Sequence, residues 1–300
     1  MRWLIKNPAP EGAEGRRWGD FHFGRGLAAA LESIGQQVDT DYWGAWDAGR
    51  EADVVLVLRG RRAWRPEGDC LKVLWLISHP EEVSDDELGL YDLVLVASEK
   101  HAAKLKERLS VPVEPLLQAV DGELFSPRDW PAHRPRDHFV FVGNTRNEPR
   151  ESVLWAAEAG LPLKVWGKGW ERWIDSRFIA GDYLDYRKLP AVFAAAKATL
   201  NDHWPEMSRL GYVNNRVFEA LACGLPVISD FQKGLSAMFE GAVLTFKDRD
   251  QFQACLQRVW LEYPVVRARA ERVAQRVAEE HSFAARARSL LQATEGLRAS

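Results

Sequence analysis

One stretch of this 300-residue chain combines charged, amide and apolar residues in a pattern suited to holding an anion. It is Leu200–Asp230, LNDHWPEMSRLGYVNNRVFEALACGLPVISD. Asn214 and Asn215 precede apolar residues spaced three and four apart, which predicts a helix. The first N–H groups and positive dipole end of a helix attract anions, and Arg216 adds a full charge. Glu219, one turn further, can accept hydrogen bonds from hydroxyls, so the pattern suits a diphosphate beside a ribose.

The segment RVFEALACGLPVISD, with LNDHW upstream, resembles the nucleotide-sugar-binding motif of glycosyltransferases of the GT-B fold. The resemblance is strongest to the CgeB-like "glycosyl transferases group 1" branch, which is related to glycosyltransferase family four. It implies an α/β fold in which two doubly wound, Rossmann-like domains face each other across a cleft. The C-terminal domain would hold the nucleotide and the N-terminal domain the acceptor. The alternative is an ordinary buried helix and strand of an α/β domain.

The sequence departs from family four at one position of this motif. That family carries a Glu-x7-Glu pair, and Glu219 matches its second, ribose-binding member. Eight residues earlier stands Gly211 instead of an acid. The contact that the first Glu usually makes to the donor sugar is therefore missing, or it is supplied by another residue such as Glu206 or Asp202. The donor sugar and the retaining stereochemistry typical of the family stay open.

Two further loops follow expected strands and carry positive charge. In VGNTRNEPR, Arg146 or Arg150 could neutralise a diphosphate, and we favour Arg146. The alternative is a capped helix with solvated arginines. In GKGW, Lys168 is a point charge for a phosphate and Trp170 could stack on a base. The alternative there is a tight turn with an exposed lysine.

Candidate catalytic residues come from both halves of the chain. Asp202 and His203 end a strand and would lie near the donor sugar or its pyrophosphate, although His203 could equally be a structural residue packed under Trp204. In WGDFHFG, Asp20 or His22 could be the general base of an inverting reaction, and Asp20 could equally be a helix N-cap.

A third candidate in the N-terminal half follows the apolar run LKVLWLI. In family four, a histidine on the loop after such a strand contacts the donor sugar, and His79 matches that position in kind. The resemblance therefore implies that His79 lines the cleft.

Alternating strands and helices occur in two series, which is the doubly wound signature. The run SPRDWPAHRPRD between the series is rich in proline and reads as a linker. We therefore expect an acceptor-side domain at 1–126, a linker at 127–137 and a nucleotide-sugar-binding domain with C-terminal helices at 138–300. The expected helix in the first series spans Phe23–Ile34, and the last helical stretch breaks near His281.

Composition narrows the classes of protein and partner. The net charge of -3 gives no general attraction to nucleic acid, and three widely spaced cysteines favour neither a zinc site nor disulfides. No apolar run is long enough to span a membrane and no secretion signal begins the chain, so a cytoplasmic location is expected. Arg59, Arg61, Arg62 and Arg65 form a basic loop, which is either solvated or in contact with a phosphate-bearing acceptor or a membrane surface.

These observations favour a metal-independent enzyme without a cofactor, which moves a sugar from a nucleotide-diphosphate donor to a hydroxyl of a glycan, a lipid-linked or another acceptor. We expect Arg146, Lys168, Asn214, Asn215, Arg216 and Glu219 to bind the donor, and Asp20, His22, His79 and Asp202 to act in catalysis. Two alternatives remain: a nucleotide- or glycan-binding relative without transfer activity, and a nucleotide-sugar epimerase on the same fold.

Overall fold

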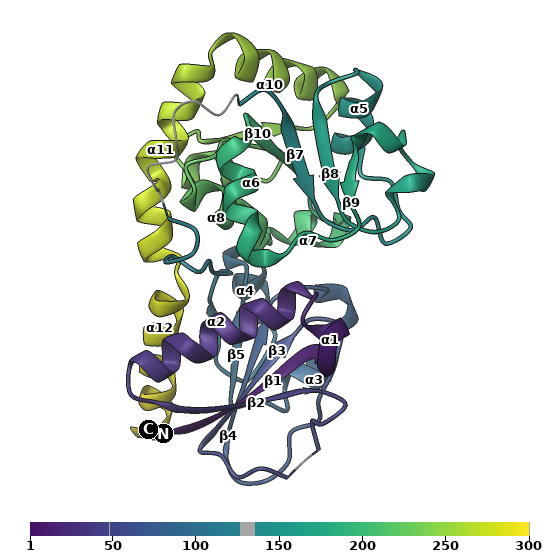
Figure 1. Cartoon of the computed structure of the whole chain (residues 1–300). Helices are drawn as coiled ribbons and strands as arrows, with labels where there is room; N and C mark the ends of the chain where they lie inside the picture. Colours follow the sequence, from purple (N-terminus) through teal and green to yellow (C-terminus); the bar gives the residue numbers. More distant parts are fainter. Residues whose placement is uncertain (48, 127–135, 300) are drawn as a thin grey trace. The chain divides into compact units, whose positions relative to one another are not determined.

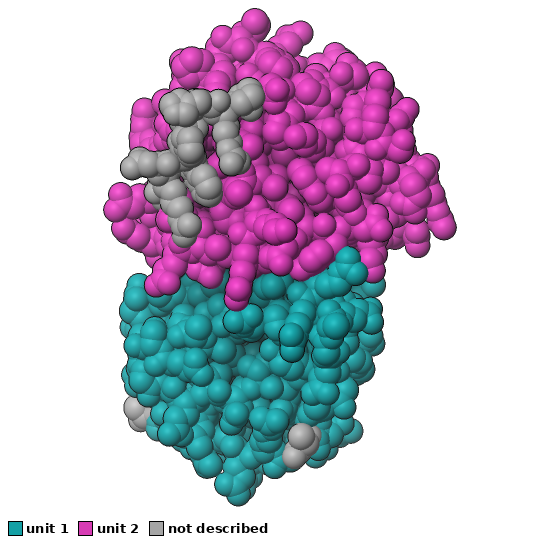
Figure 2. Space-filling view, viewed as in Figure 1, with its two compact units in different colours: residues 1–119, 205–213, 281–300 teal, residues 120–204, 214–280 magenta. Residues whose placement is uncertain are grey.

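The computed structural model describes residues 1–47, 49–126 and 136–299, which form two compact units (Figure 2). Unit 1 contains residues 1–119, 205–213 and 281–300, and unit 2 contains residues 120–204 and 214–280. Most of the expected linker, 127–135, lies outside the described residues. The expected boundaries differ from these units because two segments of the C-terminal half, 205–213 and 281–300, pack within unit 1.

Unit 1 is built on a parallel sheet in the order β2-β1-β3-β4-β5-β6. The apolar runs at its centre, such as Val54–Arg59, are buried along their whole length, as expected for strands covered on both faces. The six strands belong to the first of the two expected series of strands and helices. Their bounds are β1 Arg2–Pro10, β2 Gln37–Trp43, β3 Val54–Arg59, β4 Leu71–Leu76, β5 Leu93–Val96 and β6 Val113–Pro115.

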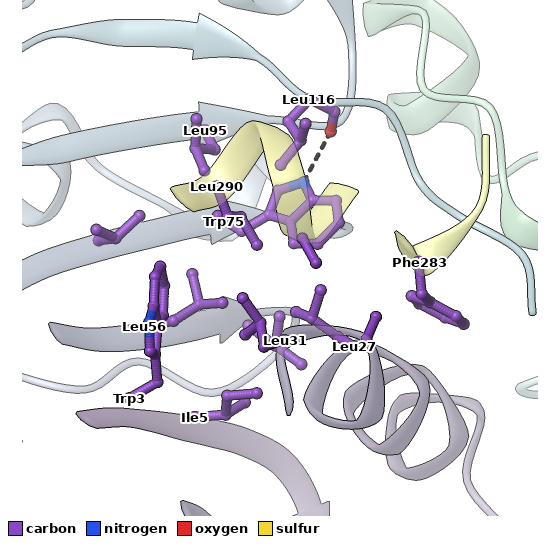
Figure 3. Close-up of a cluster of buried hydrophobic side chains, with 14 of the residues drawn as sticks. Trp3, Ile5, Leu27, Leu31, Leu56, Trp75, Leu95, Leu116, Phe283 and Leu290 are labelled. Carbon is purple, nitrogen blue, oxygen red and sulfur yellow. Dashed lines mark hydrogen bonds between the residues drawn. The ribbon is translucent and has the colours of Figure 1, made fainter. Parts of the chain in front are cut away.

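The core of unit 1 is filled by large apolar side chains from the sheet and from two helices (Figure 3). Trp75 lies at its centre and donates its indole N–H to the Leu116 carbonyl at 2.7 Å, which satisfies the polar atom of a fully buried ring. Phe283 of the last helix stacks edge to face on Phe23, with ring centroids 5.0 Å apart. The C-terminal helix is therefore part of this core.

The helices of unit 1 are α1 Gly12–Gly15, α2 Gly19–Ser33, α3 Asp85–Leu88, α4 Glu99–Lys106, α7 Pro205–Leu210 and α12 Phe283–Ala299, with a 3-10 turn η1 at Pro80–Glu82 (Figure 1). Helix α2 begins at Gly19, four residues before the expected start at Phe23. Residues 19–22, which contain Asp20 and His22, are therefore helical, whereas the expected helix began after them. Gly24 is needed there because a Cβ at this position would lie 2.1 Å from the Asn7 amide nitrogen.

The segment 205–213 has no counterpart in the elements expected from sequence. It forms α7 and packs on α4 within unit 1. The Tyr212 hydroxyl and the His101 Nδ1 lie 2.8 Å apart, and Ser98 donates to the Leu210 carbonyl at 2.6 Å. Burial lowers the pKa of His101 to about 4, so the ring is neutral at physiological pH. These contacts hold the residues just before the motif helix to unit 1.

Unit 2 is built on a second parallel sheet in the order β12-β11-β10-β7-β8-β9. Counted from its own first strand this is the order 3-2-1-4-5-6 of a dinucleotide-binding Rossmann sheet. Its strands are β7 Phe139–Val142, β8 Leu163–Trp166, β9 Ile179–Gly181, β10 Ala198–Asn201, β11 Val227–Asp230 and β12 Val243–Phe246. The short β9 was not expected from sequence, because its three residues IAG carry no strand pattern.

The helices of unit 2 alternate with its strands. They are α5 Glu151–Glu158, α6 Leu189–Ala195, α8 Asn215–Ala222, α9 Leu235–Met238, α10 Arg249–Leu261 and α11 Tyr263–Glu280, with 3-10 turns η2 Trp170–Arg172, η3 Ser176–Phe178 and η4 Tyr186–Lys188. The break expected near His281 separates α11 from α12. Helix α8, predicted from its apolar spacing, buries every residue from Val217 to Ala222.

Candidate functional site

The candidate site lies where the strand order of unit 2 reverses, between β7 and β10. Strand β7 pairs with both β8 and β10, so the segments that follow β7 and β10 leave the sheet in different directions. In open α/β sheets, ligands bind at this switch point, outside the carboxyl ends of the strands. The sequence expectations for Arg146, Asp202 and the tip of α8 therefore fall on the segments that flank the switch point.

An ion pair joins these segments. The Arg150 guanidinium contacts Asp202 Oδ1 and also donates to the Asp202 carbonyl at 2.6 Å. Ser152 donates to Asp202 Oδ2 at 2.7 Å, so both carboxylate oxygens have partners. Arg150 is 9% exposed. A buried, hydrogen-bonded ion pair makes its surroundings rigid, so it would hold the ligand-binding surface in place. In this arrangement Asp202 orders the switch point, and its catalytic role stays a prediction.

Two arginines lie close to the ring of Trp204. The guanidinium of Arg150 lies 4.3 Å from the ring centroid and that of Arg146 lies 5.1 Å from it. Arg146 is exposed, and its backbone has the left-handed φ of 53°, which L-residues with a side chain adopt at a cost. This ring contact leaves an exposed planar cation on the loop after β7, and a guanidinium can bind a phosphate bidentately.

The loop after β8 packs against the loop after β7. Lys168 is exposed, and its backbone N–H donates to Asn144 Oδ1 at 2.8 Å. Trp170 is fully buried and donates its indole N–H to the Gly143 carbonyl at 2.8 Å. The expectation that Trp170 stacks on a base is therefore wrong in this structure, because the ring is part of the core of unit 2.

A closed ring of hydrogen bonds surrounds the N-cap of α8, and we call it the cap ring. Asn214 Nδ2 donates to Asn201 Oδ1 at 2.9 Å, and Asn201 Nδ2 donates to Ser229 Oγ at 2.9 Å. Ser229 donates to Asp230 Oδ1 at 3.0 Å, and His203 Nδ1 lies 2.7 Å from the same oxygen. The ring closes where the backbone N–H of Asn214 donates to His203 Nε2 at 3.2 Å. His203, whose side chain has no exposed surface, is thus a structural neighbour of the helix tip.

One acceptor of the cap ring is left over. Within the part of the chain that the structure describes, no donor reaches the buried Oδ1 of Asn214. A buried acceptor without a donor costs roughly 1–3 kcal/mol. Such an atom in a native site commonly marks the place of a water or ligand group.

The second turn of α8 contains a buried carboxylate. The Glu219 side chain is 1% exposed and accepts from Asn215 Nδ2 at 3.1 Å and from the Arg216 guanidinium. Tyr186 of η4 also hydrogen-bonds the carboxyl group. Desolvation raises the pKa of Glu219, although Arg216 and these hydrogen bonds act in the opposite direction. The expected donor-binding residues Asn214, Asn215, Arg216 and Glu219 are therefore brought together at one helix end.

The catalytic candidates of the N-terminal half lie in unit 1. Asp20 is in the first turn of α2, whose N-cap is Trp18, so the N-cap alternative for Asp20 is wrong. His22 is half-buried and stands edge to face with Phe21, with ring centroids 5.4 Å apart. Their part in catalysis stays a prediction.

His79 follows β4 in a left-handed conformation with φ 53°. Its Nε2 accepts from Arg61 Nε at 3.1 Å, and its Nδ1 lies 2.9 Å from Ser78 Oγ. An observed backbone outlier at the carboxyl end of a strand is typical of functional sites. Arg59 of the expected basic loop is instead buried and pairs with Glu87 at 2.6 Å.

The contributors to the site that were not inferred from the sequence include Tyr186, Asn201, Ser229 and Asp230. Asn201 and Ser229–Asp230 end adjacent parallel strands, and polar residues at such ends were the available signal. Tyr186 had none, because η4 reaches Glu219 only through the fold.

Among residues 1–47, 49–126 and 136–299, no group of three or more His, Cys, Asp or Glu could hold a metal ion. No helix in the same residues is both long and apolar enough to cross a membrane.

Comparisons with known proteins bear on both the motif and the fold. A family model described as glycosyl transferase-like matches residues 146–292, which include β10, the cap ring and α8 but not β7. No curated protein sequence matches the chain. The narrower relationship to the CgeB-like branch and to family four stays a prediction.

Solved structures match the whole chain. A sucrose-phosphate synthase from Thermosynechococcus elongatus is 15% identical, with 100% of this chain and 99% of that chain covered and a TM-score of 0.71. AviGT4, a glycosyltransferase involved in avilamycin A biosynthesis, is 16% identical, with 100% and 99% covered and a TM-score of 0.67. Anabaena HepE in complex with UDP-glucose is 14% identical, with 98% and 100% covered and a TM-score of 0.65. Together with the two six-stranded parallel sheets, these likenesses establish that the chain has the α/β GT-B fold of two Rossmann-like units.

Proposed function

We propose that the protein is a glycosyltransferase that moves a sugar from a nucleotide-diphosphate donor to an acceptor hydroxyl. The observation that carries this proposal is the buried Glu219 carboxylate behind the tip of α8, at the switch point of a Rossmann sheet. Burying a charged group is costly, and a ribose diol would give this carboxylate partners that a purely structural helix does not need. The glycosyl transferase-like match over residues 146–292 supports the same activity.

We assign the diphosphate to the positive groups around the switch point. The N-terminal turn of α8 supplies backbone N–H groups, and Arg216, Arg146 and Lys168 supply charge. Arg216 would exchange its contact with Glu219 for the phosphates as the ribose hydroxyls reach the carboxylate. Preorganised donors of this kind stabilise the charge that develops on the leaving diphosphate. We therefore assign this task to the protein rather than to a metal, and expect transfer to be unaffected by a chelator.

We assign a hydroxyl of the transferred sugar to Asn214. Its Oδ1 has no donor among the described residues, so a ligand hydroxyl would satisfy it. This contact would replace the one that the first Glu of the family-four pair makes to the donor sugar, because that position is Gly211 in this chain. The backbone of Gly211 has φ +80°, and an added Cβ would lie 3.3 Å from Lys100 Cβ, so an acid at this position would be strained. Asp202, the other substitute considered, is held by Arg150.

The acceptor side of the reaction is assigned to unit 1. If the reaction inverts configuration, Asp20 or His22 would be the general base that takes the acceptor proton. If it retains configuration, the leaving phosphate would take that proton and His79 would contact the donor sugar. The acceptor is a glycan, a lipid-linked or another hydroxyl compound. Sugar transfer assays with purified protein and labelled donors, followed by product stereochemistry, decide between these routes.

Nucleoside diphosphate binding tests the site directly. UDP is the first probe because HepE was solved with UDP-glucose, followed by GDP, ADP and dTDP in isothermal titration calorimetry. Glu219→Gln and Arg216→Met should each weaken binding about 10- to 100-fold, the loss of one charge-assisted hydrogen bond.

The control for this experiment is the pair formed by Arg258 of α10 and Glu262, the C-cap of that helix. These residues form an exposed ion pair at 3.4 Å with similar chemistry, away from the switch point. Arg258→Met and Glu262→Gln should bind as the unaltered protein does. Equal affinities in both pairs of variants would remove the site assignment.

The absent acid at position 211 favours one alternative, a nucleotide-sugar-binding protein without transfer activity. A transferase and a binding protein without transfer activity would both bind the nucleoside diphosphate. Only the transferase would release it from a nucleotide sugar in the presence of acceptors. An epimerase would convert the free nucleotide sugar without any acceptor. A donor screen that reports released nucleoside diphosphate and the configuration of the remaining donor separates the three.

A further inference from the structure

The cap ring has a single consistent arrangement of protons. Asp230 accepts from Ser229, from the His203 ring and from the His203 backbone N–H at 3.1 Å. A carboxylate can only accept, so the His203 proton must be on Nδ1 and the Ser229 hydroxyl must point to Asp230. His203 Nε2 is then a lone pair, which is what the Asn214 N–H requires.

The same reasoning continues around the other arm. Because the Ser229 hydroxyl donates its hydrogen bond to Asp230, Ser229 Oγ accepts the hydrogen bond from Asn201 Nδ2. Asn201 Oδ1 is then the acceptor for Asn214 Nδ2. One carboxylate thus dictates the tautomer of His203 and the orientation of both amides, and each arm ends on Asn214.

We infer that His203 and Asp230 are positioning residues that fix the N-terminus of α8 for a diphosphate, an inference that rests on the proposed function. The two arms hold Asn214 at both its backbone N–H and its side-chain amide. The backbone N–H groups of the next residues of α8 would face the phosphates. Their positions are fixed because Asn214, the residue before them, is held at two points. Neither side chain needs to touch the ligand for its loss to weaken phosphate binding.

A second histidine–aspartate pair in unit 2 provides the contrast. His138 Nδ1 lies 2.9 Å from Asp137 Oδ1, and His138 is nearly as buried as His203. This pair stands at the beginning of β7, at the amino end of the sheet, whereas the cap ring is at the carboxyl end. Both pairs consist of a histidine and an aspartate. The His203–Asp230 pair is linked to the N-cap of α8, whereas the His138–Asp137 pair lies at the opposite end of the sheet.

The first test needs no ligand. In ¹⁵N-labelled protein, His203 is expected to carry its proton on Nδ1 and to show an unprotonated Nε2, and in Asp230→Leu the population is expected to shift toward the Nε2-protonated form. Protonation on Nε2 in the unaltered protein would overturn the inference. This result is independent of the proposed function.

The second test separates positioning from folding. His203→Phe should lose at least 10-fold in affinity for UDP, or for whichever nucleoside diphosphate the protein binds, and less than 2-fold for the matching nucleoside. His203→Gln keeps an acceptor near the place of Nε2 and should recover most of this loss. His138→Phe should bind both probes as the unaltered protein does.

The outcomes are distinct. Equal loss for nucleoside and nucleoside diphosphate, or no loss in a folded His203→Phe, would overturn the positioning role. If His203→Phe does not fold, Ser229→Ala opens the other arm and should show the same phosphate-selective loss in smaller degree, and its absence would overturn the inference. If the unaltered protein binds none of the nucleoside diphosphates, the proposed function fails, while the labelled histidine still tests the proton arrangement.

Discussion

Replacing Arg216 by Met should destabilise the protein in a strongly pH-dependent way. The substitution removes the cation from a Glu219 side chain that is 1% exposed. A buried carboxylate that has lost its cation becomes protonated, because the neutral acid is less costly to bury. From the ordinary carboxyl pKa of 4.5, protonation at pH 7 costs at most about 3.4 kcal/mol, at about 1.4 kcal/mol per pH unit. At pH 5 the same limit is about 0.7 kcal/mol.

The sign follows from the direction of the shift. Burial raises the folded-state pKa of Glu219 above that of the unfolded chain. Its contribution to stability is therefore fully present below pH 4.5 and is lost as pH rises through the folded-state pKa. Without Arg216 the folded-state pKa rises further, and the loss at pH 7 grows. Arg216→Met should therefore be far less stable than the unaltered protein at pH 7 and close to it at pH 5.

Urea unfolding followed by circular dichroism at both pH values measures these differences. Four chains are compared: the unaltered protein, Arg216→Met, Glu219→Gln and the double variant. The double variant carries no charge at either position, so its stability relative to Glu219→Gln should not depend on pH. An Arg216→Met penalty that is equal at pH 5 and pH 7, or one that persists in the double variant, would refute the reasoning.

Three further predictions concern the surroundings of the site. The pKa of His101 is lowered from its ordinary 6.5 to about 4, so the stability that this histidine contributes is present above pH 6.5 and is lost as pH falls toward 4. His101→Phe should therefore make the free energy of urea unfolding less dependent on pH between 6.5 and 4. An unchanged slope in that window would contradict this prediction. Gly167→Ala should lower the melting temperature by several degrees, because its φ is +144° and the new Cβ would lie 2.1 Å from the Gly143 carbonyl oxygen; Gly160→Ala, with φ +66° and open space around it, is the steric control in a thermal melt. Trp170→Phe should cost about 1–3 kcal/mol in urea unfolding by leaving that carbonyl without its donor, and should leave UDP affinity unchanged, whereas a base-stacking Trp170 would show the reverse.

Local patterns were enough to place most elements of both sheets. The run LKVLWLI is apolar except for Lys72 because β4 is covered on both faces. The three- and four-residue spacing of Val217, Phe218 and Leu221 predicted α8, which is buried from Val217 to Ala222. The segments that sequence reasoning missed depend on distant partners. Helix α7 is stabilised by contacts with α4 more than a hundred residues away, and no local pattern signals them.

The candidate site shows the same division. The types and spacing of Asn214, Arg216 and Glu219 pointed to a helix tip with a carboxylate behind it, and the structure brings them together. The role of Asp202 could not be read from its position, because Arg150 and Ser152 reach it only across the switch point. Trp170 was misjudged for a related reason: only packing decides whether a ring after a glycine turn lies in the core or at the surface.

The sequence by itself determined the α/β class, two series of strands and the residues at the tip of α8, because periodicity, turn residues and helix ends act over a few residues. Only the tertiary structure decided the strand order, the packing of 205–213 and α12 within unit 1, and the closed ring that joins His203, Asp230 and Asn214. The physical reason is that these features are contacts between segments far apart in the chain. Their energies depend on geometry that no local run of residues specifies.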